Sequence, residues 1–515
     1  MVRMRDGVRL NTAVYSPRGK GPFPVVLTRL PYDVTASDVF IAEVAPVVTA
    51  HGFVLVAQDC RGKARSGGNL RMWVNEVDDG VDTMDWLAER GWCNGSVFLW
   101  GDSYSAFTQW AIAASGHSAL AAMAPRNTSS DVGGGWLHRQ QVPRLLFPGL
   151  WSAHAAVDHS MYDVGMADMD WGLFAPRELH AHSLEGLAST EYPAWGQRPV
   201  DAWPQAVYGA ADPLAVRVPV LHVGGWFDEF RHVQMREWKQ ARQLNPSLHY
   251  LEMRPTDHVD FVMGSPSSGD IWSERQRRVR DRPESFIEPQ LTFFEWILGR
   301  RDQPYPPITI TAAFSTEPAS EPAHGPNTIF LRSDGSLGDQ AGTINQGWLH
   351  DPAHPVPSTQ PDEISWAAIP ADDLAITERD DVLTFSGALS SAPWTIRGDL
   401  SLRVRIHTPG RRRTHIMAKL LDIAPDGSSL RIADGAAVVK SDGATVNLVD
   451  LGPTYYVVRS GHRLTLLLSS SEYPRYALQP IDWNDPWGEP DLSQVEHYLV
   501  GDNETAPAIL ITPSF

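Results

Sequence analysis

Short apolar runs alternate with helical patterns along the first part of the chain. Continuously apolar, strand-like runs lie at 24–28, 53–57 and 96–100. A helix-length stretch ends at Ala50, and residues 77–90 space their apolar side chains along one helical face. Continuous apolar strands between helices predict a mostly parallel sheet that is buried on both faces.

The strand rhythm stops after Asn127 and resumes at 218–223 and 248–253. Residues 290–298 then form an apolar helix pattern. No strand candidate lies between Asn127 and Val218, so we expect a helical insertion there. The predicted units are the first part of an α/β domain at 1–128, a helical insertion or cap at 129–212 and the second part of the α/β domain at 213–303.

Beyond Pro304 the pattern changes to short β-rich runs, such as 308–311, 402–406 and 463–468. Asp-Gly turn signals separate several of these runs, at Asp334-Gly335, Asp426-Gly427 and Asp442-Gly443. Many short strands without helices predict an antiparallel jelly-roll β-sandwich at 304–515.

Composition and charge narrow the function classes. The chain has 515 residues and a formal net charge of −18, which disfavours binding to a phosphate backbone, so we expect no nucleic-acid partner. No run is long and apolar enough to span a membrane, and no charged-then-apolar signal peptide opens the chain; we expect a cytoplasmic protein. The two cysteines are far apart in the sequence, which excludes a disulfide framework and a Cys-rich zinc site.

A candidate nucleophile lies where the strand at 97–100 meets a helix that starts near Ala106. The sequence there is Gly101-Asp-Ser103-Tyr-Ser105, and a nucleophile elbow needs small residues two positions either side of its serine. The helix amino terminus would help to stabilise a developing anion. Ser103 could instead be an ordinary helix cap, and the pentapeptide alone does not separate the two.

A serine nucleophile of this architecture needs an acid and then a histidine later in the chain, each after a strand. Asp228 follows the strand at 218–223, and His258 follows the strand at 248–253. Asp228 could also cap a helix, with Glu229 as a rival, and His258 could be a solvated loop residue. Three candidates in the required order favour a Ser103–Asp228–His258 triad.

Several motifs together resemble the CocE/NonD hydrolases, the group of cocaine esterase, α-amino acid ester hydrolases and X-prolyl dipeptidyl aminopeptidases. The resemblance covers nearly the whole chain and rests on the following segments: Met4–Leu10, Arg29–Asp33, Asp59–Gly62 with Ser66-Gly67, Gly101–Ala106, Gly225–Asp228, Ser460–Leu464 and Ser469–Pro474. It implies an α/β hydrolase fold with a helical cap and a C-terminal jelly roll.

The resemblance also implies an oxyanion hole made by the Tyr32 hydroxyl and the backbone N–H of Tyr104. The positions at which the amino acid ester hydrolases hold a substrate ammonium with acids read Phe230 and Arg231 here, which argues against an α-amino acyl preference. A homodimer is the simplest assembly that the resemblance implies.

The function that follows is a serine hydrolase that cleaves a small-molecule ester or amide through an acyl-enzyme, without a cofactor. One alternative is an acyltransferase or biosynthetic tailoring enzyme that uses the same acyl-enzyme, and another is a non-catalytic jelly-roll binding protein.

Aromatic and Met residues of the cap, such as Trp136 and Met161, could line an apolar pocket or simply form a core. Pairs such as His180/His182 and Asp168/Asp170 do not form a metal-ligand set, so we expect no metal. We expect the acids of the 77–90 helix, Asp78, Asp79 and Asp82, to form a solvated face.

Overall fold

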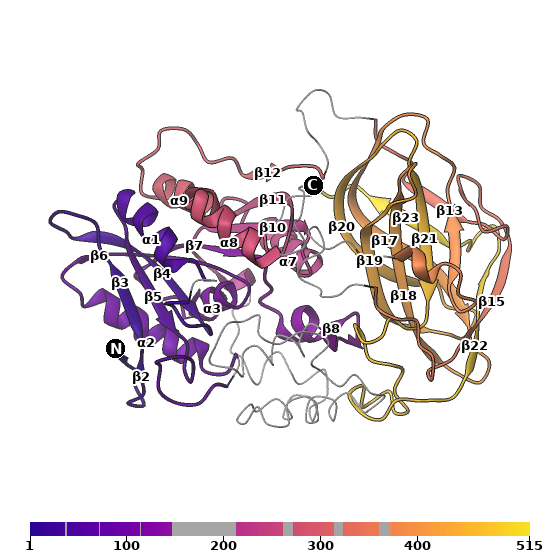
Figure 1. The fold of residues 1–515 in the computed structure, drawn as a ribbon, viewed down its shortest axis with the longest axis horizontal. Helices are drawn as coiled ribbons and strands as arrows, with labels where there is room; N and C mark the ends of the chain where they lie inside the picture. Colours follow the sequence, from indigo (N-terminus) through magenta and orange to yellow (C-terminus); the bar gives the residue numbers. More distant parts are fainter. Residues whose placement is uncertain are drawn as a thin grey trace.

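The molecule consists of an α/β part and an all-β part that lie side by side (Figure 1). The computed structural model describes residues 1–36, 39–71, 73–113, 115–146, 213–260, 271–313, 323–359, 371 and 373–515. Most of the expected cap, residues 147–212, lies outside the described residues. No helix in the described ranges is long and apolar enough to cross a membrane.

A mostly parallel sheet forms the centre of the first part. Among the described residues, eight strands lie in the order β12-β11-β10-β7-β6-β4-β5-β3, and only β3 runs antiparallel to its neighbour. The strands are β3 (Thr12–Tyr15), β4 (Phe23–Leu30), β5 (Val54–Asp59), β6 (Cys93–Asp102), β7 (Leu120–Arg126), β10 (Val220–Phe227), β11 (His249–Asp257) and β12 (Ile308–Ile310). A two-strand hairpin, β1 (Val2–Arg3) with β2 (Arg9–Leu10), precedes the sheet.

Helices cover both faces of this sheet, as its continuously apolar strands predict. Val26 and Phe98 pack with residues of α1 and α9, whereas Val25 and Val97 pack with residues of α2 and α3. Neighbouring strand residues therefore face opposite layers, which is the two-residue period of a strand. The helices are α1 (Ile41–Ala50), α2 (Glu76–Ala88), α3 (Tyr104–Ala113), α7 (Arg231–Leu244), α8 (Ile271–Asp281) and α9 (Pro283–Ile297).

The strand expectations are confirmed for β4, β5, β6, β10 and β11, but two others need correction. The run at 308–311 was expected in the jelly roll, yet β12 pairs in parallel with β11 and extends the first sheet. The segment after Asn127 was expected to hold no strand, yet it contains a short π-helix, η1 (Val132–Leu137), and a hairpin of β8 (His138–Arg139) with β9 (Val142–Pro143).

The all-β part is an antiparallel sandwich of two sheets. Among the described residues, one sheet has seven strands, with β17 pairing β20, β22 and β23, and the other has four in the order β16-β21-β18-β19. The strands are β13 (Thr328–Leu331), β14 (Leu337–Gly338), β15 (Ile344–His350), β16 (Leu383–Ser386), β17 (Trp394–His407), β18 (Arg413–Ile423), β19 (Ser429–Lys440), β20 (Asn447–Val458), β21 (Arg463–Ser469), β22 (Val495–Gly501) and β23 (Ala508–Thr512). Gly335, Gly427 and Gly443 all have positive φ. Hairpin turns are confirmed at Asp334-Gly335 and Asp426-Gly427, which join the paired strands β13–β14 and β18–β19, whereas Asp442-Gly443 joins β19 of one sheet to β20 of the other.

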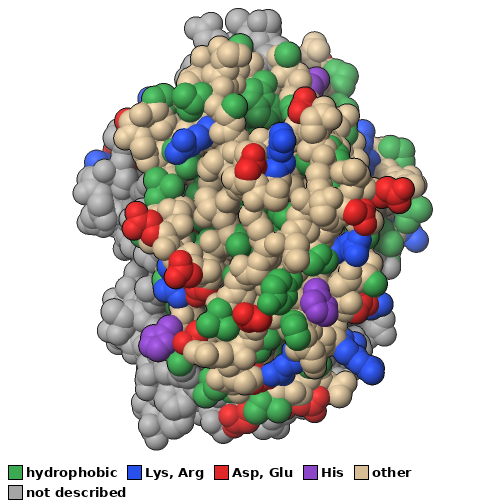
Figure 2. Space-filling view, turned by 90° about the vertical axis from the view of Figure 1, so that its right-hand side faces the viewer, with side chains coloured by type: hydrophobic (Ala, Val, Ile, Leu, Met, Phe, Trp, Pro, Cys, Tyr) green, Lys and Arg blue, Asp and Glu red, His purple; other side chains and the backbone are tan. Residues whose placement is uncertain are grey.

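The core of the sandwich continues into the α/β part. Its apolar cluster joins inward residues of β17 and β18, such as Leu402 and Leu420, to Trp226, Met235 and Trp238 of the α/β part. On the face of the sandwich seen in Figure 2, hydrophobic side chains are scattered among charged ones. Among the described residues, the apolar core of the sandwich is therefore continuous with apolar side chains of the α/β part.

A buried carboxyl group connects α7 to the loop that follows β7. Glu237 is 6% exposed, and its Oε1 accepts hydrogen bonds from the Ser129 hydroxyl (2.9 Å) and from the Ser130 hydroxyl (2.9 Å) and N–H (3.0 Å). Burial raises the pKa of Glu237 to about 7, although these hydrogen bonds oppose the shift.

We expect the stability of the parent protein to fall between pH 6 and 8 relative to Glu237→Gln. At pH 6 the folded Glu237 carboxyl still holds a proton that the unfolded chain, near its ordinary pKa of 4.5, has already lost, and by pH 8 the folded carboxyl has lost it too. The difference in free energy of unfolding should change by about 1 kcal/mol in favour of the amide as the pH rises. Denaturant unfolding of both proteins at pH 6 and pH 8 measures it, and a difference that does not change with pH contradicts the expectation.

Removing the jelly roll should leave insoluble or inactive protein although no triad candidate is lost. The cut beyond Pro304 that the sequence suggests also removes β12, so a chain that ends at residue 313 is the sharper test. Its α/β part would expose Trp226, Met235 and Trp238 to water. Gel filtration and ester hydrolysis measure the outcome, and a monodisperse truncated protein with the parent kcat/KM would show a detachable module.

Candidate functional site

Ser103 sits in a strained turn between β6 and α3. Its φ is 55°, which a residue with a side chain rarely adopts, and its carbonyl accepts the N–H groups of Ala106 and Phe107 at the start of α3. A Cβ on Gly101 would lie 2.6 Å from the Cβ of Ser105, so glycine is required there and a large residue at 105 would not fit. This geometry is that of a nucleophile elbow, as the sequence predicts.

Asp228 and His258 come together at the same edge of the sheet. Asp228 follows β10 and His258 follows β11, and the His258 Nδ1 lies 2.5 Å from the Asp228 Oδ2. The other carboxylate oxygen accepts the Phe230 N–H at 2.7 Å, and the Asp228 side chain is fully buried. With Nδ1–H donating to the carboxylate, His258 Nε2 carries the lone pair that a general base needs.

The Gly224-Gly225 pair lets β10 approach β11 closely just before Asp228. A Cβ on Gly225 would lie 2.3 Å from the Thr256 carbonyl oxygen. The register between the two strands shifts between Gly225 and Phe227, which is a bulge at the end of the pair. The strands therefore bring the two loops close enough for the Asp228–His258 contact.

The two oxyanion-hole candidates follow neighbouring strands of the sheet, β4 and β6. Tyr32 is a half-buried residue of the turn after β4, and β4 pairs with β6. Tyr104 is the first residue of α3, so its backbone N–H belongs to the helix amino terminus. The Tyr104 hydroxyl is buried; it donates to Glu76 Oε1 at 3.0 Å and accepts the Trp73 N–H at 2.7 Å.

A cluster of buried charged residues contacts the Tyr104 side chain of the elbow. One of its members, Asp79, was expected elsewhere. Asp79 of α2 is 1% exposed and pairs with Arg61, whereas a solvated face was expected. Arg29, also buried, lies 3.0 Å from Glu76 Oε2 and 3.9 Å from Asp79. Asp78 is exposed as expected, whereas the Asp82 side chain is only 11% exposed, and both pair with Arg5. Glu76 therefore connects the Arg29 guanidinium to the Tyr104 hydroxyl under the elbow.

Two residues at the end of β7 hold the site, and sequence reasoning missed both. Arg126 donates from Nε and Nη2, one edge of its guanidinium, to the two carboxylate oxygens of Asp102, the residue before Ser103. Its Nη1 lies 3.8 Å from Asp260, which follows His258 by two residues. Asn127 has a φ of 48°, and its Nδ2 donates to the His258 carbonyl at 3.3 Å. A usable signal was the polar pair Arg126-Asn127 directly after an apolar run.

Aromatic side chains close the space beside the histidine. The Phe230 ring lies 5.7 Å from the His258 ring and 4.6 Å from the Trp136 ring, measured between centroids. Phe230 and Trp136 are both buried. The other cap residues suggested for an apolar pocket lie outside the described residues.

The described residues contain no group of three His, Cys, Asp or Glu side chains that could hold a metal ion. His180, His182, Asp168 and Asp170 lie outside them. Both cysteines, Cys60 and Cys93, are free thiols, and Cys60 is buried.

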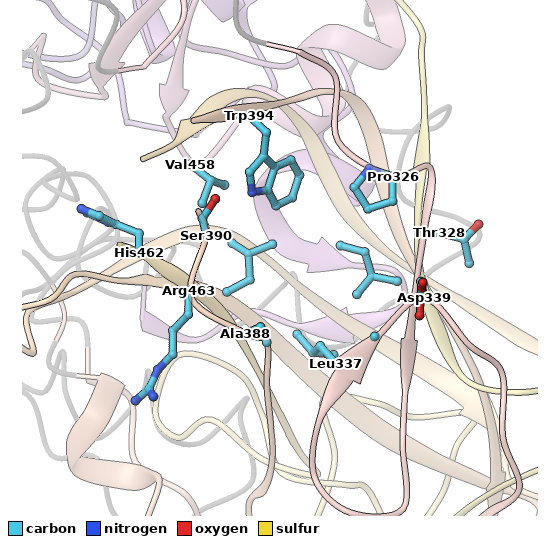
Figure 3. Close-up of a pocket in the computed structure, with 14 residues that line it drawn as sticks. Pro326, Thr328, Leu337, Asp339, Ala388, Ser390, Trp394, Val458, His462 and Arg463 are labelled. Carbon is cyan, nitrogen blue, oxygen red and sulfur yellow. The ribbon is translucent and has the colours of Figure 1, made fainter. Parts of the chain in front are cut away.

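A cavity of about 190 Å³ lies in the jelly roll, away from the triad candidates. Leu337, Trp394 and Val458 contribute apolar surface to it, whereas the Arg463 and His462 side chains point away from it (Figure 3). Ligand sites need a few polar groups aimed inward, so this cavity does not compete with the strand edge as the reactive site.

Known proteins match both the α/β part and the all-β part of this chain. Residues 6–260 match the family model of X-Pro dipeptidyl-peptidase (S15 family), and residues 305–501 match that of the X-Pro dipeptidyl-peptidase C-terminal non-catalytic domain. Cocaine esterase of Rhodococcus sp. (strain MB1 Bresler) is 28% identical over 540 residues, which cover 92% of this chain and 91% of the esterase.

Solved structures show the same fold. An α-amino acid ester hydrolase matches with a TM-score of 0.75 at 22% identity, covering 99% of this chain and 95% of that one. A CocE/NonD family hydrolase from Staphylococcus aureus matches with a TM-score of 0.67 at 14% identity, covering 99% and 92%.

These findings define the chain as a serine hydrolase with an α/β hydrolase fold and a C-terminal antiparallel β domain. Within that class it belongs to the CocE/NonD family of hydrolases.

Proposed function

We propose that this protein is a serine esterase in which Ser103 is the nucleophile, His258 the general base and Asp228 the residue that orients the imidazole. The observation that carries the proposal is the 2.5 Å contact between His258 Nδ1 and Asp228 Oδ2, at the strand edge that also holds the Ser103 elbow. The similarity to a cocaine esterase supports ester cleavage over other acyl chemistry.

The proposed reaction has two halves. Ser103 Oγ attacks the ester carbonyl carbon while His258 Nε2 takes its proton, and the carbonyl oxygen becomes an oxyanion. The Tyr32 hydroxyl and the Tyr104 N–H donate hydrogen bonds to that oxyanion. The intermediate collapses to an acyl-Ser103, and His258 gives its proton to the departing alkoxide. Water then attacks the acyl group with the same base, which releases the acid and restores the serine.

Ser103→Ala should lower kcat for p-nitrophenyl acetate by several orders of magnitude, on the order of 10⁴-fold or more, because the remaining groups have no nucleophile to activate. Ser115→Ala, an exposed serine just beyond α3, is the matched control and should keep the parent rate. A fluorophosphonate probe should label the parent and the control at Ser103. Parent-like hydrolysis by Ser103→Ala, or labelling of another residue, would falsify the assignment.

We propose further that the acyl group is neutral and apolar. The Phe230 ring lies beside His258, and Trp136 packs against Phe230. Glu229, the described acid nearest to Asp228 in sequence, is bound by two arginines instead of being available to an ammonium group. Arg231, which follows Phe230, is buried and donates to the Trp226 carbonyl at 2.7 Å, so this position does not supply an acid to bind an ammonium group either.

p-Nitrophenyl butyrate should therefore be hydrolysed with a kcat/KM at least about tenfold above that of the 2-aminobutyrate ester, since burying an unpaired ammonium costs more than one factor of ten. Steady-state kinetics with both esters checks this, and equal values would show that a carboxylate elsewhere binds the ammonium. Addition of an alcohol to the same assay, compared with an enzyme-free control, tests the acyl-transfer alternative. Free butyric acid as the sole acyl product supports hydrolysis, and a new ester formed only in the presence of enzyme supports transfer.

A further inference from the structure

Glu229, the residue after the triad candidate Asp228, is a buried anion bound by two buried cations. The Glu229 side chain is 4% exposed; its Oε1 lies 2.9 Å from Arg144 and its Oε2 lies 3.1 Å from Arg475. Arg144 follows β9 in the described first part of the expected cap, whereas Arg475 belongs to the jelly roll. The loop that carries Asp228 is therefore held by an ion pair that crosses between the two parts of the molecule.

Arg475 is itself fixed inside the jelly roll by acids. Its guanidinium pairs with Asp434 of β19 and lies 3.4 Å from Glu472, three residues earlier in the chain. Burial alone would raise the pKa of Asp434, but Arg475 and Arg431 hold it below its usual range, so the acid is ionised. Glu472 and Arg475 lie in and just after the Ser469–Pro474 segment that the sequence resemblance singled out.

The cluster continues away from the active site through side chains that do not touch Glu229. Lys419 lies 3.0 Å from Glu472 and 3.1 Å from Asp373, and Arg431 lies 2.6 Å from Asp373. These residues are all buried. The cluster thus extends from Glu229, next to Asp228, to Asp373 inside the jelly roll. A substitution at Asp373 can therefore serve as the control for a substitution at Glu229.

Arg231, three residues after Asp228, makes a second contact with the jelly roll. Arg231 donates to the Trp226 carbonyl at 2.7 Å and to the Leu451 carbonyl of β20 at 3.3 Å. Asp228 is therefore followed within three positions by two residues, Glu229 and Arg231, that both contact the jelly roll. A buried charge that loses its partner must move or neutralise, so the position of this loop depends on the jelly-roll partners.

We propose that Glu229 and Arg475 are positioning residues through which the jelly roll sets the orientation of Asp228, and with it the imidazole of His258. This inference rests on the proposed triad. The jelly roll contributes no group to the reacting atoms in this scheme; it determines the rate because a loop displaced by a fraction of an ångström no longer aligns the Asp228–His258 hydrogen bond.

The test compares two isosteric variants that each remove one carboxylate charge from the same cluster. Glu229→Gln changes the end beside Asp228, and Asp373→Asn changes the end inside the jelly roll. We expect Glu229→Gln to lower kcat for p-nitrophenyl butyrate at least tenfold with KM within threefold of the parent, because binding is untouched and only the catalytic alignment is lost. Asp373→Asn should keep kcat per folded molecule within twofold, whatever it does to Tm.

Folded concentration comes from circular dichroism and gel filtration, with kinetics measured well below the Tm of each variant. A parent-like kcat in Glu229→Gln, a change confined to KM, or equal losses in both variants overturns the proposal. If Glu229→Gln does not fold, Arg475→Lys replaces it in the same comparison, because lysine keeps the charge but cannot reach Glu229 and Asp434 together. Ser103→Ala is assayed in parallel: activity that survives in it sinks the proposed triad, whereas its loss leaves the two variants to decide the positioning role.

Discussion

The shared edge of parallel strands is the constraint on which the rest of this structure depends. β6, β10 and β11 run in the same direction in one sheet, so the loops after them emerge at one edge. Ser103, Asp228 and His258 occupy those loops although up to 155 residues separate them in the sequence. No local pattern could bring them together; the hydrogen-bonded register of the strands does so.

Two buried charge clusters lie next to the loops at that edge. Arg29, Glu76 and Asp79 lie beneath the elbow, and Glu229, Arg475 and Asp434 lie beneath the Asp228 loop. Burying an ion is costly unless its partners are well placed, so each cluster ties the loop above it to a specific arrangement of neighbours. The second cluster makes the jelly roll a structural neighbour of the active site, and the apolar core shared by both parts points the same way.

Much of the fold was predictable from residue patterns, for reasons that particular elements make clear. β4 and β5 are continuously apolar because both faces are covered, and the Asp-Gly turns of the sandwich need the positive φ that glycine supplies. β12 was assigned to the wrong part because an exposed three-residue edge strand has no pattern that names its partner. Asp79 was expected in solvent because helix periodicity does not reveal an arginine that arrives from another loop. The cytoplasmic location and the dimer stay predictions.

The amino-acid sequence was sufficient to predict most helices and strands, their order and the residue types of the candidate site. Strand and helix periods, glycine turns and the Ser–Asp–His order are all features of short segments that can be recognised without the folded structure. It also carried the family motifs, including the Ser469–Pro474 segment, without their reason. Only the tertiary structure decided that Arg126 and Asn127 hold the elbow and the histidine loop, and that Arg475 reaches Glu229. Such contacts join side chains from distant segments, and their pairing is set by strand register and domain packing, which no local spacing encodes.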